Sequence, residues 1–404
     1  MKSIKQKQLD FLDWEFGVFF HFGIRTFSEG HRDWDGKTMD LSAFDPQELS
    51  CEEWIRTVYE AGAKYTVLVC KHHDGFANWP SAYTDYSVKN TPWKQGNGDV
   101  VGEFTAACRK FGIKVGLYYS PAQVGWEGQS AKDYDDYFIN QVTELLTRYG
   151  TIDYLWFDGC GSEGHQYDTK RIVNAIRSCQ RNILLFNMWD PDTRWVGNEA
   201  GLADSPNPLW VDEVDFSVRT EEKDALSAAR FLPAECDCRM RLENWFYSDL
   251  DSHTVKSVDE LMGLYYYSVG RGANLLLNIG PDRTGRLPAQ DRENLLEFGR
   301  RIRMLRGSAL DCQVSDEGNK LTLTLEMSLV NHVTLEEVPG ENMVTSFSIR
   351  AYPVPYGSPI TVYTGTTIGH KAICPFPTVR TQKLEILLDR PVKVKAQLQY
   401  LPRF

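Results

Sequence analysis

The sequence predicts an α/β fold in which a (β/α)8-type barrel occupies residues 1–306 and an antiparallel β-sandwich occupies residues 307–404. Two observations support this prediction. Up to about residue 305, short apolar segments alternate with amphipathic ones, as parallel strands alternate with the helices that cover them. Beyond residue 307, hydrophobic residues alternate with a period of two and helical periodicity is absent.

The barrel pattern is clearest in the segment Tyr154-Leu155-Trp156-Phe157-Asp158-Gly159. Four apolar residues without polar alternation are typical of a strand that is covered on both faces. Similar segments predict strands at residues 17–23, 65–70, 114–119, 183–187 and 274–278, and a further strand that ends near residues 234–235. Amphipathic spacing predicts helices at residues 52–61, 100–111, 134–148, 171–179, 258–269 and 290–305.

The predicted sandwich begins where this alternation of strand and helix stops. Residues 321–325 and 392–398 alternate apolar and polar side chains, and residues 384–388 do so in part. Such alternation predicts antiparallel strands with one buried face.

Composition narrows the classes of partner. The net charge is −11, which makes nucleic acid and anionic membranes unfavourable partners. No apolar run approaches the roughly 20 residues that a membrane-spanning helix needs. The basic first residues lack a continuous apolar segment behind them, so we expect a cytoplasmic protein, or a secreted or periplasmic one if a signal peptide has been removed.

The cysteines and aromatic residues add two expectations. The nine cysteines are scattered and odd in number, without a Cys-x-x-Cys pair, which indicates reduced thiols rather than disulfides or a structural zinc site. Aromatic residues make up 12% of the chain, with 11 Trp and 19 Tyr. Their flat apolar faces suit the C–H faces of sugar rings, although a large barrel core would also use them.

Polar residues with catalytic potential follow the predicted strands. His21 ends the first strand, His72 and His73 the second, Tyr118 the third, Asp158 the fourth, and Glu235 a later one. The carboxyl ends of barrel strands form one face, so we expect these side chains to converge there although they are far apart in sequence.

Two carboxylates in such a position would suit glycoside hydrolysis, in which one attacks or activates water and the other protonates the leaving oxygen. Asp158 is the candidate nucleophile. Glu199, in the loop after the fifth predicted strand, and Glu235 are both candidates for the acid/base, and Trp195 could give Glu199 the apolar surroundings that raise a carboxyl pKa.

His72-His73-Asp74 could instead be read as a metal site. Adjacent residues of an extended strand point to opposite sides, and further ligands with regular spacing are missing. We therefore expect no metal and no other cofactor, and we expect the histidines to exchange hydrogen bonds with sugar hydroxyls.

Several of these motifs resemble those of the α-L-fucosidases of glycoside hydrolase family 29. Residues 17–23 are similar to the opening strand of that family, Lys71-His72-His73-Asp74-Gly75-Phe76 to its double-histidine motif, residues 155–159 to its nucleophile strand and residues 272–281 to its late-barrel signature. Residues 365–371 resemble part of its C-terminal sandwich, so the resemblance covers nearly the whole chain. Residues 195–199 and 233–237 resemble the branch that acts on α-1,3/1,4-linked fucose in branched glycans.

The resemblance implies a retaining mechanism, with Asp158 as nucleophile and Glu199 as acid/base, and Glu235 as its substitute. It also implies a fucose pocket and a fucosylated oligosaccharide as substrate. The residues expected in that pocket are His21, Asp33, Trp34, His72, His73, Tyr118, Trp156, Glu235 and Arg239. Two departures concern the family's usual Glu-Trp pair, here Asp33-Trp34, and the loop at residues 120–123, which lacks the expected aromatic and acidic residues.

Other functions remain open on the sequence alone. They are an α-L-fucosidase of broad or α-1,2 specificity, a transfucosidase, a metal-dependent barrel hydrolase built on His72-His73-Asp74, and a sugar-binding protein without activity. The sequence leaves the oligomeric state open.

Overall fold

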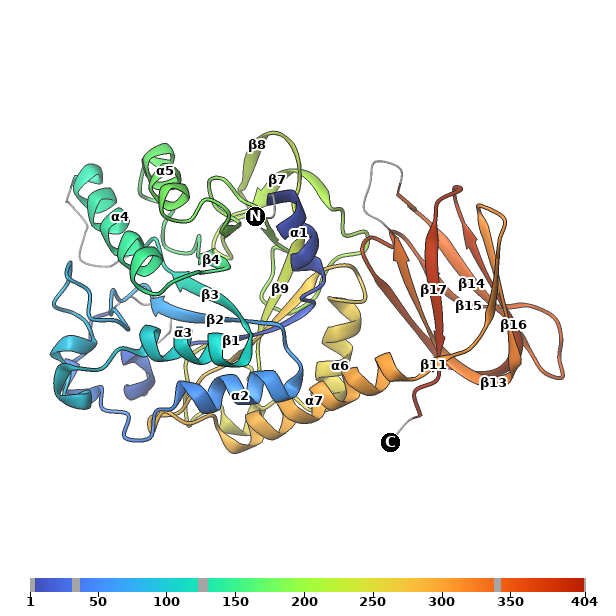
Figure 1. Ribbon diagram of the computed structural model, residues 1–404, viewed down its shortest axis with the longest axis horizontal. Coiled ribbons are helices and arrows are strands. Elements are labelled where there is room, and N and C mark those ends of the chain that lie inside the picture. The colour runs from blue at the N-terminus through green and yellow to red at the C-terminus, as the bar shows by residue number, and fades with distance from the viewer. Residues whose placement is uncertain (1–3, 31–36, 123–129, 338–342, 403–404) are drawn as a thin grey trace.

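The computed structural model describes residues 4–30, 37–122, 130–337 and 343–402. It has two parts, a barrel of strands with helices around it and an antiparallel sheet, and the long helix α7 (Ala289–Gly307) leads from the first to the second (Figure 1). The predicted fold class, an α/β barrel followed by an antiparallel sandwich, is confirmed.

Eight parallel strands form the barrel sheet, in the order β5-β4-β3-β2-β1-β10-β9-β6. They are β1 (Phe16–Phe20), β2 (Tyr65–Lys71), β3 (Lys114–Tyr119), β4 (Tyr154–Phe157), β5 (Leu184–Phe186), β6 (Arg194–Trp195), β9 (Ala234–Arg239) and β10 (Asn274–Ile279). A parallel bridge between Phe186 and Thr193 joins β5 to the residues just before β6, so the ring is nearly closed.

Helices cover most of this ring, and their ends follow from local sequence signals. Besides α7 they are α2 (Cys51–Ala61), α3 (Val100–Phe111), α4 (Ala131–Arg148), α5 (Thr169–Cys179) and α6 (Val258–Tyr267). Ser50 and Asp99 cap the backbone N–H groups at the starts of α2 and α3. Gly62 and Gly112 end the same helices at positive φ, where a side chain would be strained.

The barrel departs from strict alternation after β5. Residues 187–193 connect β5 to β6 without a helix, and an antiparallel hairpin of β7 (Trp210–Asp215) and β8 (Lys223–Phe231) lies between β6 and β9. The sequence did not predict β6 or this hairpin, because β6 has only the residues Arg194 and Trp195 and the hairpin strands are largely exposed. Five short 3-10 helices lie in other connections: Ile24–Phe27, Leu41–Ala43, Val88–Asn90, Trp93–Gly96 and Ser252–Thr254.

A helix that the sequence did not predict, α1 (Ile4–Leu12), covers the amino-terminal end of the barrel. Phe11 on this helix is fully buried, and its ring centroid lies 5.9 Å from that of Tyr65 and 5.3 Å from that of Tyr154, which are the first residues of β2 and β4. The side chain of Asn274, the first residue of β10, donates a 2.7 Å hydrogen bond to the carbonyl of Phe11.

The C-terminal part is an antiparallel sandwich. Its strands are β11 (Ala309–Leu310), β12 (Gln313–Asp316), β13 (Lys320–Glu337), β14 (Phe347–Pro353), β15 (Ile360–Gly365), β16 (Ala372–Leu388) and β17 (Val394–Gln399). β13 and β16 are long and carry bulges, so that their two halves share one core with Leu323, Val333 and Leu384 buried in it. The three predicted strands lie in β13, β16 and β17.

Glu15 links the sandwich to the barrel. Its buried carboxylate pairs with Lys371 of the sandwich and Arg306 of α7, and it accepts a 2.8 Å hydrogen bond from the hydroxyl of Tyr265. Among the helices that the structure describes, none has the length and apolar character required to cross a membrane.

Candidate functional site

A cavity of about 530 Å³ opens at the carboxyl end of the barrel. Most of the residues that the sequence singled out line it, although they come from six different strands or the loops that follow them. These are His21, His72, His73, Tyr118, Trp156, Asp158, Glu199 and Arg239. Asp33 and Trp34, and the end of the loop at residues 120–123, lie outside the described residues.

Asp158 follows β4 directly and is held by groups from two directions. The hydroxyl of Tyr118 donates a 2.8 Å hydrogen bond to its Oδ2, and the backbone N–H of Cys160 donates one of 2.8 Å to its Oδ1. Nε2 of His73 lies 3.6 Å from Oδ2. Burial raises the pKa of Asp158 to about 6, while the two hydrogen bonds act in the opposite direction. The carboxylate is therefore ionised at neutral pH and fixed in the cavity.

The glycine after Asp158 allows the cavity wall to approach. A Cβ on Gly159 would lie 1.9 Å from the carbonyl oxygen of Phe216, in the segment that follows β7. Phe216 lines the cavity, so a side chain at position 159 would push this wall away.

Glu199 lies in the loop that follows β6 and also lines the cavity. Its carboxylate is 3.7 Å from Nη1 of Arg239, and its side chain is 30% exposed. The side chain of Trp245 lies near this carboxylate and lowers its pKa. Burial raises the pKa of Glu199, Arg239 opposes this shift, and the negative charge of Asp158 adds to it. Such a carboxyl group can hold and release a proton.

Glu235 occupies a different place from the one predicted. The prediction that it ends its strand is wrong, because β9 begins at Ala234 and ends at Arg239. Glu235 is fully buried inside the barrel, where it accepts hydrogen bonds from Tyr65 (2.6 Å), Trp156 (2.8 Å) and Tyr154 (3.3 Å). Burial raises its pKa to about 7. It is not among the residues that line the cavity, and it supports Trp156, which does.

The histidines that line the cavity are held as neutral rings. Nδ1 of His21 pairs with Oδ1 of Asn278 at 2.7 Å, and Nδ1 of His73 pairs with Oγ of Ser120 at 2.6 Å. Burial lowers the pKa of both rings to about 3, and it lowers that of His72 as well. Nδ1 of His72 is buried without a hydrogen-bond partner among the described residues.

His72 and His73 face the same cavity, which corrects the expectation that they point to opposite sides. β2 ends at Lys71, so the two residues lie beyond the extended strand, and their ring centroids are 4.2 Å apart. Asp74 instead lies 3.1 Å from Nε of Arg25 in a buried ion pair. Ligand atoms of His72, His73 and Asp158 lie within 4.8 Å of one another, which is close enough to hold a metal ion.

Asp237 and Trp245 are among the cavity residues that were not predicted from the sequence. Asp237 accepts a 2.7 Å hydrogen bond from the indole of Trp195, and burial together with the charge of Glu199 raises its pKa. Period-two alternation along β9, which places Glu235, Asp237 and Arg239 on one face, was a usable signal for it. Trp245 comes from a loop after β9 and had no such signal.

Comparisons with known proteins agree on one family. A family model described as alpha-L-fucosidase matches residues 39–304. Putative alpha-L-fucosidase 1 of Oryza sativa subsp. japonica is 33% identical over 93% of this chain and 80% of its own length. A solved structure of a putative alpha-L-fucosidase from Bacteroides ovatus superposes with a TM-score of 0.88 at 31% identity, over 100% of this chain and 77% of that chain. One from Bacteroides thetaiotaomicron gives 0.87 at 29% identity, over 97% and 96%.

Proposed function

Because the chain belongs to the alpha-L-fucosidase family, we propose that it hydrolyses terminal α-1,3/1,4-linked L-fucose from branched glycans with retention of configuration. Asp158 is the proposed nucleophile and Glu199 the proposed acid/base. The observation that supports this assignment best is the setting of Asp158, an ionised carboxylate fixed by Tyr118 and Cys160 in a cavity that Glu199 also lines.

In the first step, a carboxylate oxygen of Asp158 attacks C1 of the fucosyl unit. Glu199 gives its proton to the glycosidic oxygen, and the aglycone leaves as an alcohol. Burial raises the pKa of Glu199, which is the direction that a general acid requires.

In the second step, Glu199 is ionised and takes a proton from water. The water oxygen attacks C1, the bond to Asp158 breaks, and α-L-fucose is released. Retaining enzymes need their two catalytic carboxyl groups about 5–5.5 Å apart for these two steps.

The neutral histidines fit a ligand that is rich in hydroxyl groups. A neutral ring offers one N–H donor and one nitrogen acceptor, and a sugar hydroxyl can satisfy both kinds of group. The unpartnered Nδ1 of His72 is buried at the cavity and would gain a hydrogen bond on binding. Trp156 and Trp245 add aromatic surface to the cavity wall for the apolar face of the sugar.

Single substitutions combined with azide test the two roles. We expect Asp158→Asn to abolish release of fucose from an activated aryl fucoside without loss of folding. We expect Glu199→Ala to lose activity on natural glycosides and to keep it on substrates with good leaving groups, with azide restoring turnover. Near-normal hydrolysis by Asp158→Asn would reject the nucleophile. Azide rescue of Glu235→Ala but not of Glu199→Ala would reverse the acid/base assignment.

Linkage preference is tested by comparing substrates. The proposal rests on the resemblance of residues 195–199 and 233–237 to the α-1,3/1,4 branch. We expect faster release from a branched Lewis trisaccharide than from 2'-fucosyllactose. The reverse order would indicate α-1,2 or broad specificity, and accumulation of fucosylated acceptor in the same assay would indicate a transfucosidase.

A further inference from the structure

The loop between β9 and α6 brings part of the cavity wall into place. Its ends meet where the backbone N–H of Met240 bonds to Asn278 and that of Lys256 bonds to Met240, both at 2.9 Å. The loop between these points contributes Glu243, Asn244 and Trp245 to the cavity. A compact loop with closed ends of this kind needs side-chain contacts to hold its shape.

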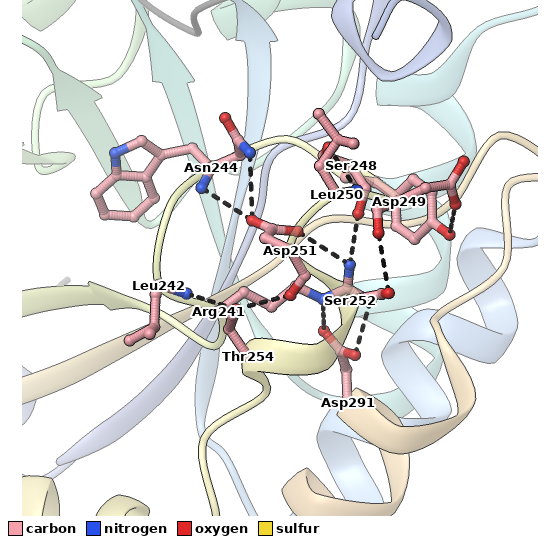
Figure 2. A network of polar contacts seen from close by, with 12 residues as sticks. Arg241, Leu242, Asn244, Ser248, Asp249, Leu250, Asp251, Ser252, Thr254 and Asp291 are labelled. Carbon is pink, nitrogen blue, oxygen red and sulfur yellow. Dashed lines mark hydrogen bonds and ion pairs between the residues drawn. The ribbon is translucent and has the colours of Figure 1, made fainter. Parts of the chain in front are cut away.

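A buried ionic cluster organises this loop (Figure 2). Nε and Nη2 of Arg241 each donate a 3.0 Å hydrogen bond to the carboxylate of Asp291, in the first turn of α7. Nη1 of Arg241 lies 3.3 Å from Oδ1 of Asp251 and bonds to the carbonyl of Ser248 at 2.9 Å. All three charged side chains are at least nine-tenths buried, so their mutual contacts are strongly directional.

Asp251 connects the ionic cluster to Asn244, the residue before Trp245. Its Oδ2 accepts hydrogen bonds from the backbone N–H of Asn244 at 3.1 Å and from the Asn244 side chain at 3.3 Å. The next residue, Trp245, is fixed from the other side because Asn278 donates a 2.7 Å hydrogen bond to its carbonyl. The backbone of Trp245 is thus held between the ionic cluster and β10.

Trp245 in turn lies beside two other residues of the cavity. Its ring lies 4.9 Å from that of His21, and the guanidinium of Arg239 lies 5.3 Å from its ring centre. The same guanidinium lies 3.7 Å from the carboxylate of Glu199. The surroundings of Glu199 therefore depend on the loop through Trp245 and Arg239.

We propose that the Arg241–Asp251–Asp291 cluster positions the acid/base, because it fixes the loop that holds the ring of Trp245 beside Arg239, the ion-pair partner of Glu199. This inference rests on the proposed function and adds positioning residues to it. None of the three charged groups lines the cavity, so they act through Trp245 and touch no substrate.

Asp251→Asn tests the link. An amide has one acceptor oxygen, so Asn cannot serve both Arg241 and Asn244 in the same way. We expect kcat/KM to fall at least about tenfold for a fucosyl oligosaccharide, the effect of losing one hydrogen bond to a charged group. We expect less than about a threefold fall for a dinitrophenyl fucoside, whose leaving group departs without a proton. Arg241→Lys, which loses the bidentate pairing with Asp291, should show the same selectivity.

A double-variant cycle connects the cluster to the indole. Trp245→Phe keeps an aromatic ring and removes the larger indole that lies beside Arg239, and we expect the same dependence on leaving group. Combining it with Asp251→Asn should add little to the larger single loss, because both changes break one pathway. Asp249→Asn is the matched control: Asp249 lies on the same loop and pairs with Arg283, so its activity on both substrates should stay near that of the parent.

Equal losses on both substrates, or losses that multiply in the double variant, would overturn the positioning role and leave the cluster with a structural role alone. Such a result would leave the proposed function intact, since the parent protein would still release fucose. Absence of fucose release by the parent protein from either substrate would instead overturn the proposed function and this inference with it.

Discussion

The hydroxyl of Tyr118 donates a 2.8 Å hydrogen bond to Oδ2 of Asp158. Tyr118 lies on β3 and Asp158 directly follows β4, and the two strands pair with Tyr118 opposite Trp156. This register lets the tyrosine side chain reach the carboxylate across the mouth of the barrel. The contact stabilises the ionised form of Asp158, which is the form that a nucleophile requires.

Replacement of Tyr118 by Phe should move the acid limb of the pH profile. The hydrogen bond lowers the pKa of Asp158, which burial has raised to about 6, so its loss raises that pKa further. Activity grows with pH as the nucleophile ionises, and we expect the acid limb of kcat/KM to move up by about one pH unit. Tyr119→Phe is the control, because the hydroxyl of Tyr119 bonds to Gln141 instead. An unmoved acid limb would contradict the prediction.

Glu235→Gln should change how stability depends on pH. The folded protein holds a proton on Glu235 up to a pKa of about 7, whereas the ordinary value is 4.5. Between these values the unfolded chain has released a proton that the folded protein keeps, so the free energy of unfolding falls as pH rises. Gln does not titrate, and the variant should gain up to about 3 kcal/mol relative to the parent over this interval. Denaturant unfolding at about pH 5 and about pH 8 measures the difference, and a constant difference would reject the raised pKa.

Activity of the same Glu235→Gln variant provides a separate prediction. Gln can still accept a hydrogen bond from Trp156 and can donate to Tyr65, so the wall of the cavity is retained. We expect kcat/KM within about tenfold of the parent, because Glu235 lies beneath the cavity wall rather than in the cavity. A much larger loss that azide reverses would show that Glu235 does the proton transfer.

Glu15→Gln should weaken the attachment of the sandwich to the barrel. Burial raises the pKa of Glu15, but Lys371 and Arg306 outweigh it, so the pKa lies below its ordinary value. The stabilisation is therefore present above the unfolded pKa and is lost as pH falls through the folded one. We expect a loss of about 3 kcal/mol near neutral pH and a smaller one in acid, measured by thermal unfolding. Glu336→Gln, which removes a more exposed partner of Lys371, should have little effect.

Treatment with a chelator distinguishes the proposed two-carboxylate mechanism from a metal-dependent hydrolysis. Ligand atoms of His72, His73 and Asp158 lie close enough for a metal ion, but the proposed mechanism assigns Asp158 to C1 of the sugar. We expect full fucosidase activity after extended dialysis against a strong chelator. Loss of activity that a divalent ion restores would contradict the two-carboxylate mechanism.

The sequence carried enough information for most of the barrel because its strands are nearly continuous apolar runs. β6 and β9 are exceptions: β6 has only two residues and was not predicted, and the start of β9 was taken for its end. Residues 235, 237 and 239 face the interior as Glu, Asp and Arg, and the partners that satisfy the two acids are Tyr65, Trp156 and Trp195. Those partners come from other strands, so the period-two spacing of these residues shows that they share a face but not that the barrel interior satisfies them.

The loop that carries Trp245 was beyond prediction for a related reason. Its order depends on Asp291, which belongs to α7, and on Glu29, which accepts hydrogen bonds from Ser248 and Asp249. Neither residue is near the loop in sequence. Polar contacts between residues far apart along the chain produce no periodic pattern in the sequence.

Helix α1 closes the amino-terminal end of the barrel. Phe11 packs against Tyr65 and Tyr154, so aromatic side chains fill this end of the barrel. Above this end, the buried Glu235 and its partners Tyr65 and Tyr154 fill the barrel, so the cavity is reached from the carboxyl side. For the proposed fucosidase, such a cavity suits a single terminal sugar better than the middle of a chain.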